Sequence, residues 1–226
     1  DKTYEVSIKG SELKTFDTSN VKYLTRMFYE CNSLTTLNLS NFNTSNVTEM
    51  YSMFQRCTSL TFLDLSNFDT TKVLKMDFLF DNCGSLTELD VSSFNTSNVT
   101  SMVGMFSGCN LLVTLNLSNF DTSNVIGMSS MFAYCYSLTT LDLSSFNTSK
   151  VTNIKNLFVN CRDLKTIYVS SLWSTASVIN NDSMFYNCFS LIGTSPEGTK
   201  TAYDSTKFDV SMANYTTGYL TYKSNN

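Results

Sequence analysis

The feature that most constrains this chain is a cysteine that returns at a fixed interval. The sequence numbers of consecutive cysteines differ by 26 until the last, which differs by 27, and they are Cys31, Cys57, Cys83, Cys109, Cys135, Cys161 and Cys188. A phenylalanine and a valine keep the same step, as at Phe42 and Val47. A fixed period of about 20 to 50 residues is typical of repeat architectures, whose units pack only against their neighbours. The sequence therefore predicts one continuous stack of repeats.

Each repeat contains two hydrophobic periodicities. The triplet Leu37-Asn38-Leu39 alternates apolar and polar residues, which predicts a short, half-buried strand. A Thr-Ser-Asn cluster follows, and such residues favour the start of a helix. The next apolar positions, spaced as on one stripe of a helix, are Val47, Met50, Met53, Phe54 and Cys57. Each repeat is therefore predicted to be a strand, a turn and a helix of about three turns.

These elements predict an α/β fold with a curved shape. Paired strands lie ~4.8 Å apart, whereas packed helices need ~8–10 Å. We therefore expect a horseshoe with a concave parallel sheet and short helices on its convex side. The domain prediction is an N-terminal cap strand at residues 1–12, a solenoid of about seven repeats at 13–191, and a C-terminal cap or tail at 192–226.

The repeat pattern LxLSxFxTSxVxxMxxMFxxCxSLxxL resembles the 26-residue leucine-rich repeats of BspA-like bacterial surface proteins, known from mycoplasma lipoproteins and gut bacteria. The resemblance extends from roughly Leu13 to Leu191, and the segments GTKTAYDSTKFD and GYLT are similar to the family's closing region. It implies a leucine-rich-repeat solenoid in a secreted or cell-surface protein that takes part in adhesion. It implies no catalytic residues, and a signal peptide and anchor would lie outside this chain.

Composition excludes several function classes. The net charge of −4 and pI near 4.8 argue against nucleic acid and against anionic membranes as partners. No apolar run is long enough to insert into a membrane. The chain has no histidine, no G-x-S-x-G motif and no phosphate-binding glycine loop, so we expect neither an enzyme nor a cofactor.

The cysteines are predicted to be buried free thiols. There is no CxxC pair and no histidine, so the usual zinc ligands are missing and we expect no metal site. Helices ~8–10 Å apart would also hold neighbouring cysteines beyond the Cα separation of ~7 Å that a disulfide tolerates. A buried cysteine then acts as a small apolar side chain.

Candidate binding residues are the positions where the outward side chains depart from the repeat. On the concave sheet these tentative ligand-binding residues are Phe62, Asp64, Glu88, Asp90, Asp142 and Tyr168. Surface aromatic residues give an alternative site, made of Tyr134, Tyr136 and Trp173. An ordinary solvated surface would also account for either set.

The function predicted from these patterns is a non-catalytic binding module at the cell surface or outside the cell. We expect adhesion to a host or bacterial protein through the sheet. The alternatives are a carbohydrate-binding module that uses the aromatic residues, and a structural spacer.

Overall fold

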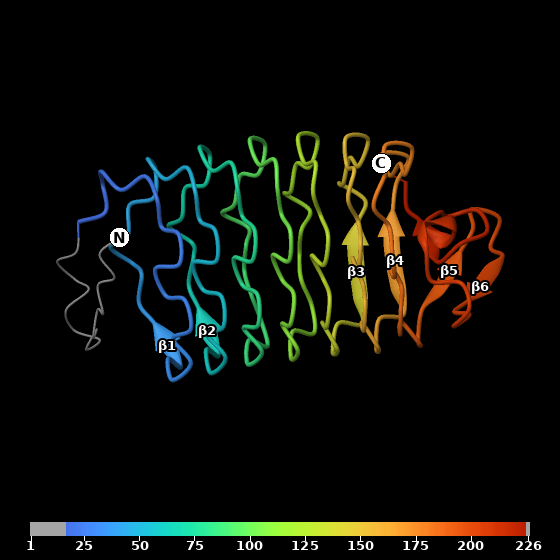
Figure 1. Ribbon diagram of the computed structural model, residues 1–226, viewed down its shortest axis with the longest axis horizontal. Helices are drawn as coiled ribbons and strands as arrows, with labels where there is room; N and C mark the ends of the chain where they lie inside the picture. The colour runs from blue at the N-terminus through green and yellow to red at the C-terminus, as the bar shows by residue number, and fades with distance from the viewer. Residues whose placement is uncertain (1–16, 225–226) are drawn as a thin grey trace.

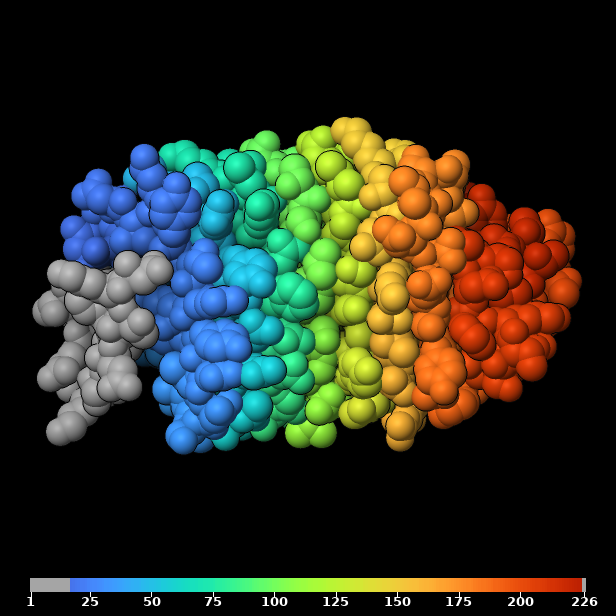
Figure 2. Space-filling model, viewed as in Figure 1, coloured from blue at the N-terminus to red at the C-terminus, as the bar shows by residue number. Residues whose placement is uncertain are grey.

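The computed structural model describes residues 17–224, which form an elongated stack of coils (Figure 1). Successive coils lie side by side in chain order, so each occupies a narrow band of the surface (Figure 2). The cap strand predicted at residues 1–12 lies outside the described residues. The sequence period is also the structural period, because residues one period apart, such as Leu37 and Leu63, are paired between neighbouring coils.

Short parallel strands form one side of the stack. β1 (Thr36–Leu37) pairs with β2 (Phe62–Leu63), and β3 (Thr140–Leu143) pairs with β4 (Thr166–Val169). Leucine, isoleucine and valine side chains point inward from these segments. The outward positions, which we call the sheet face, are Thr36, Asn38, Phe62, Asp64, Glu88, Asp90, Thr114, Asn116, Thr140, Asp142, Thr166 and Tyr168.

The C-terminal region ends the stack. It contains β5 (Ile192–Thr194), β6 (Lys200–Ala202), the short 3-10 helix η2 (Val210–Met212) and β7 (Leu220–Tyr222). The order within this sheet is β3-β4-β7-β5-β6, with only the β5–β6 pair antiparallel. The last strand of the sequence therefore lies between two earlier ones.

The helix predicted from Val47 to Cys57 is wrong, as are its counterparts in the other repeats. η2 is the single helix in the part of the chain that the structure describes, and no helix there is long and apolar enough to cross a membrane. The segment is instead a series of tight turns in which two residues of each coil have positive φ, for example Ser52 at 54° and Arg56 at 62°. An α-helix requires negative φ throughout.

Hydrogen bonds between coils explain why turns replace the helix. The N–H of Ser52 donates to the carbonyl of Asp77 at 2.9 Å, and that of Phe54 donates to Leu79 at 3.0 Å. Intervening residues bond three residues back within their own coil, as Met53 does to Met50 at 3.2 Å. Each left-handed non-glycine residue costs about 1–2 kcal/mol, but the pattern gives the N–H groups of the turns acceptors in their own or the next coil.

The geometric basis for predicting a curved horseshoe is absent from the structure. Its curvature required helices that were more widely spaced than the strands. In the structure the turn segments are also bonded directly from coil to coil. A further ladder of parallel bridges joins the coils at Tyr23, Glu49, Lys75, Ser101, Gly127, Asn153 and Asn180. Both sides therefore have strand-like spacing, and the coils in Figure 1 run side by side.

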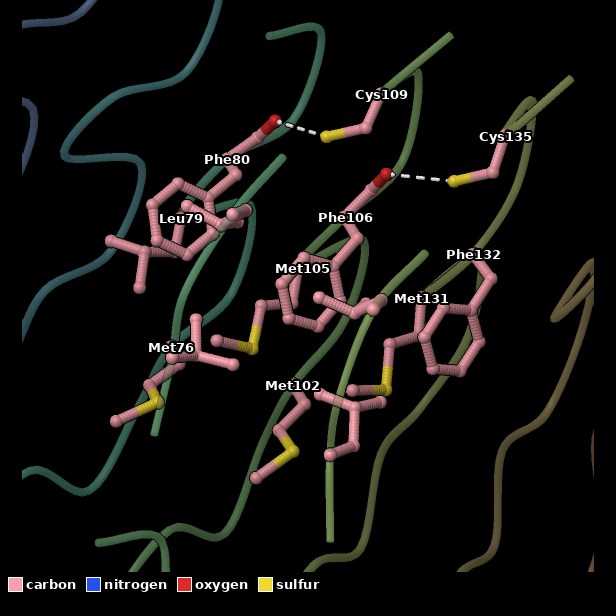
Figure 3. Close-up of a cluster of buried hydrophobic side chains, with 14 of the residues drawn as sticks. Met76, Leu79, Phe80, Met102, Met105, Phe106, Cys109, Met131, Phe132 and Cys135 are labelled. Atoms are coloured by element: carbon pink, nitrogen blue, oxygen red, sulfur yellow. Dashed lines mark hydrogen bonds between the residues drawn. The ribbon is translucent and has the colours of Figure 1, made fainter. Parts of the chain in front are cut away.

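The apolar stripe was predicted correctly although its backbone was not. Val47, Met50, Met53, Phe54 and Cys57 are all fully buried. A column of nearly parallel phenylalanine rings extends through the core, with adjacent centroids 5.6–5.9 Å apart. Its members are Phe28, Phe54, Phe80, Phe106, Phe132, Phe158 and Phe185. Figure 3 shows three of these rings beside the buried methionines.

The cysteines form a second column, and all seven are free thiols. Each thiol from Cys57 onward donates to a phenylalanine carbonyl of the preceding coil. Cys109 does so to Phe80 at 3.3 Å and Cys135 to Phe106 at 3.1 Å (Figure 3). The free thiols confirm the prediction, although the helices that were expected to separate them are absent from the described residues.

Burial should make these thiols unreactive. It raises the pKa of Cys57, Cys135 and Cys188 to about 12, whereas Cys31 is only half-buried. Because the thiolate is the reactive form, iodoacetamide should alkylate Cys31 first in the native protein. The other six should react only as the chain unfolds. Peptide mass spectrometry against time would measure this, and labelling of Cys109 as fast as Cys31 would contradict it.

Gly104 tests the packing of the turns. A Cβ added there would lie 2.5 Å from a ring carbon of Phe78, and the residue has a φ of 59°. Gly104→Ala should therefore lower the free energy of unfolding by about 1–3 kcal/mol in urea titrations. Ser130→Ala is the matched control, because Ser130 occupies the same repeat position at a φ of 55° and already has a Cβ. Equal losses in both variants would refute this explanation.

Candidate functional site

Four of the six sheet-face candidates lie together around one pocket. The pocket has a volume of about 310 Å³ and is lined by Phe62, Leu63, Asp64, Leu65, Ser66, Glu88 and Asp90. Phe62 is 63% exposed, which is unusual for a ring in a stack that buries most of its phenylalanines. Three carboxylates and an exposed ring thus share one hollow on the sheet face.

The pocket lies where the strand ladder is interrupted. β1 and β2 form a separate two-stranded sheet, and hydrogen-bonded strands resume only at β3. Within the described part of the chain, no N–H of residues 88–91 or 114–117 donates to a neighbouring coil. The coils beside the pocket are therefore joined there by side chains, for example through Ser93, whose Oγ donates to the carbonyl of Leu65 at 2.8 Å.

Hydrogen bonds favour the ionised form of the pocket's aspartates. The N–H of Ser66 donates to Asp64 at 2.9 Å, and that of Ser92 donates to Asp90 at 2.8 Å. These bonds lower the pKa of both carboxyls below the ordinary 3.8. The charge of Asp64 raises the pKa of Asp90, but the bonds from Ser92 outweigh it. The pocket therefore carries concentrated negative charge at neutral pH.

Asp142 and Tyr168 do not belong to this pocket. They face each other across the β3–β4 pair. Lys223, which follows β7, forms an ion pair with Asp142, and its ammonium lies 5.9 Å from the centre of the Tyr168 ring. Burial raises the pKa of Asp142, but hydrogen bonds from Lys223 and Ser144 leave it lowered. Asp142 and Tyr168 are therefore already in contact with a cation of the same chain, the ammonium of Lys223.

The aromatic alternative is only partly assembled. The rings of Tyr134 and Tyr136 meet edge to face, with centroids 6.3 Å apart, and the guanidinium of Arg162 lies 5.2 Å from the Tyr136 ring centre. Trp173 is not a surface residue, which corrects the prediction. It is 8% exposed, and its Nε1–H donates to the carbonyl of Ala213 at 3.1 Å. It belongs to the core that anchors the C-terminal region.

Sequence reasoning missed the residues that act over long sequence distances. Lys223 meets Asp142 across 81 positions, and Trp173 meets Ala213 across 40. Both partners lie in the C-terminal region, outside the repeats: Lys223 follows β7, which pairs with β4, and Ala213 follows η2. Within the described residues, no group of three or more histidine, cysteine, aspartate or glutamate side chains could hold a metal ion.

The lowered pKa values of Asp64 and Asp90 predict acid sensitivity. A carboxyl with a folded-state pKa below its unfolded value stabilises the fold above the unfolded pKa, and this contribution is lost as pH falls through the folded pKa. The free energy of unfolding should therefore hold steady from about pH 7 to 5 and fall below about pH 4. Carboxyl ¹³C titration by NMR would test the cause directly, and values above 3.8 for both aspartates would contradict it.

Comparison with known proteins gives the chain a family. A family model matches residues 2–110 and, in a second overlapping match, residues 84–195. The family is described as "Mycoplasma protein of unknown function, DUF285". The comparison with curated proteins found no match. Because the two matches together span well over half of the sequence, the chain belongs to the DUF285 family.

Proposed function

We propose that this protein is a non-catalytic binding module that holds a segment of an extracellular protein on its sheet face. The observation that carries the proposal is the pocket formed by Phe62, Asp64, Glu88 and Asp90. An exposed aromatic side chain with polar groups around it is typical of a binding hot spot. The neighbouring sheet-face positions are mostly threonine and asparagine, so this combination departs from the repeat.

The location outside the cell rests on the resemblance to BspA-like leucine-rich repeats. Membership of DUF285, a family described from Mycoplasma, supports this assignment, because BspA-like repeats are known from mycoplasma lipoproteins as well. On this proposal the module is secreted or attached to the cell surface and acts in adhesion. Its regular coils would present the pocket on a long, rigid surface.

The chemistry of the pocket favours binding over catalysis. Asp64 and Asp90 have lowered pKa values, so both are poor proton donors at neutral pH. The six thiols from Cys57 onward, which would be strong nucleophiles, are buried, and burial raises the pKa of groups such as Cys109 and Cys161. A surface that keeps its carboxylates charged is suited to electrostatic recognition of a partner.

A carbohydrate ligand is the second candidate, favoured by the paired rings of Tyr134 and Tyr136. Tyr134 is 44% exposed, and Arg162 stacks on its neighbour. An exposed ring such as that of Tyr134 can stack on the apolar face of a sugar while its hydroxyl remains in water. With Trp173 buried, the pair is small, so binding at a single site should be weak.

The test is a screen of the purified chain against arrays of extracellular-matrix proteins and glycans. We expect a protein ligand whose binding falls at least about tenfold in Phe62→Ala. Tyr134→Ala is the matched control, because it also removes an exposed aromatic ring but lies outside the pocket.

Each other outcome rejects the sheet-face proposal. A glycan signal that is lost in Tyr134→Ala and retained in Phe62→Ala would move the function to the tyrosine pair. Silence on both arrays would favour a structural spacer.

A further inference from the structure

We propose that the pocket around Phe62 accepts a lysine or arginine side chain from the bound protein. This inference rests on the proposed function and specifies which kind of side chain the partner places in the pocket. The partner segment would place its cation among Asp64, Glu88 and Asp90, with its aliphatic stem along the ring of Phe62. The molecule already makes such a contact elsewhere on the same face, between Lys223 and Asp142.

Lys223 shows how this face binds a cation. Its ammonium pairs with Asp142 and lies 5.9 Å from the ring centre of Tyr168. Asp142 occupies the same repeat position as Asp64, since the two are separated by three full periods of the repeat. A carboxylate beside a half-buried ring thus already holds a lysine on this face, and charge together with cation–π attraction explains the geometry.

The Phe62 pocket offers the same two components without an internal cation. Among the described residues, none of the ion pairs includes Asp64, Glu88 or Asp90. The ring of Phe62 is 63% exposed and can cover the methylene stem of a long basic side chain. A third carboxylate, from Glu88, gives the pocket more negative charge than the Asp142 site has.

The geometry fits an organic cation better than a metal ion. A metal requires several oxygen atoms that converge at ~2.0–2.6 Å. The described residues contain no group of carboxylates arranged in that way. An ammonium or guanidinium group can instead bridge carboxylates that are farther apart, and the pocket of about 310 Å³ has room for it. Binding would also relieve the repulsion that raises the pKa of Asp90.

The repeat itself supplies variants that remove charge and keep the turn. Asn38 and Asn116 occupy the same repeat position as Asp64 and accept the same bond, from Ser40 at 3.0 Å and Ser118 at 3.1 Å. Asp64→Asn with Asp90→Asn should therefore fold normally. Asp121→Asn is the matched control. Asp121 lies outside the pocket and accepts the N–H of Ser123 at 2.9 Å.

The experiment is an NMR titration of the isotopically labelled full chain with blocked peptides of sequence GGKGG. The same peptide with an acetylated lysine removes the charge, and GGRGG compares the two cations. We expect shifts at Phe62, Asp64, Glu88 and Asp90 with both basic peptides and none with the acetylated one. Binding should weaken at least about fivefold between ~20 mM and ~0.5 M salt, because an exposed ionic contact is screened.

The variants decide the result. Binding should fall at least about tenfold in the Asp64→Asn/Asp90→Asn double variant and stay unchanged in Asp121→Asn. Lys223→Ala should expose a second site, so that new shifts appear at Asp142 and Tyr168. Equal binding of the acetylated peptide, or full binding by the double variant, would overturn the inference.

These outcomes are separate from those of the array screen. A protein ligand lost in Phe62→Ala but retained in the double variant would keep the proposed function and reject the basic side chain. Absence of both an array ligand and any peptide shift would reject both proposals.

Discussion

The structure depends on one constraint, the coil-to-coil spacing set by hydrogen bonds between the turn segments, such as that from Ser52 to Asp77. Strand pairs on the sheet face add to it where they form, at β1–β2 and β3–β4. Buried threonines add a third set, since Thr44 both donates to and accepts from the backbone of Asp69. Side chains at equal repeat positions must then stack in columns, which explains the continuous ring and thiol columns of the core.

The sheet face separates the role of a residue in folding from its role in recognition. At the position of Asp64 the fold needs only an oxygen that accepts an N–H two residues later, and asparagine and aspartate both supply it. Charge can therefore vary along the face while the turns stay the same. The positions between the inward leucines are also unconstrained by the core. Phe62 and Glu88 can stand where other coils have threonine because nothing inside the stack depends on them.

The sequence predicted side-chain burial better than backbone path. The positions of Met50, Phe54 and Cys57 follow from their apolar spacing, which holds for any backbone that turns them inward. The same spacing could not distinguish a helix from turns, because the difference lies in bonds to the neighbouring coil, a full repeat away in the sequence. Grouping Phe62, Asp64, Glu88 and Asp90 was possible because strand register is regular. The burial of Trp173 and the position of Lys223 depend on the C-terminal region. That region has no sequence repeat, so its contacts could not be predicted from a period.

β7 lies between β4 and β5, so the C-terminal segment itself provides the strand that follows the last repeat in the sheet. The ring of Tyr219, just before β7, meets Phe185 edge to face at 5.4 Å and ends the column of parallel rings. The C-terminal region thus contacts only the last coils of the stack, so its packing does not depend on how many coils precede them. Duplication or loss of one repeat unit in the middle of the gene would leave this closure intact. Proteins of this design can therefore change in length through genetic recombination while the same terminal segment closes the stack.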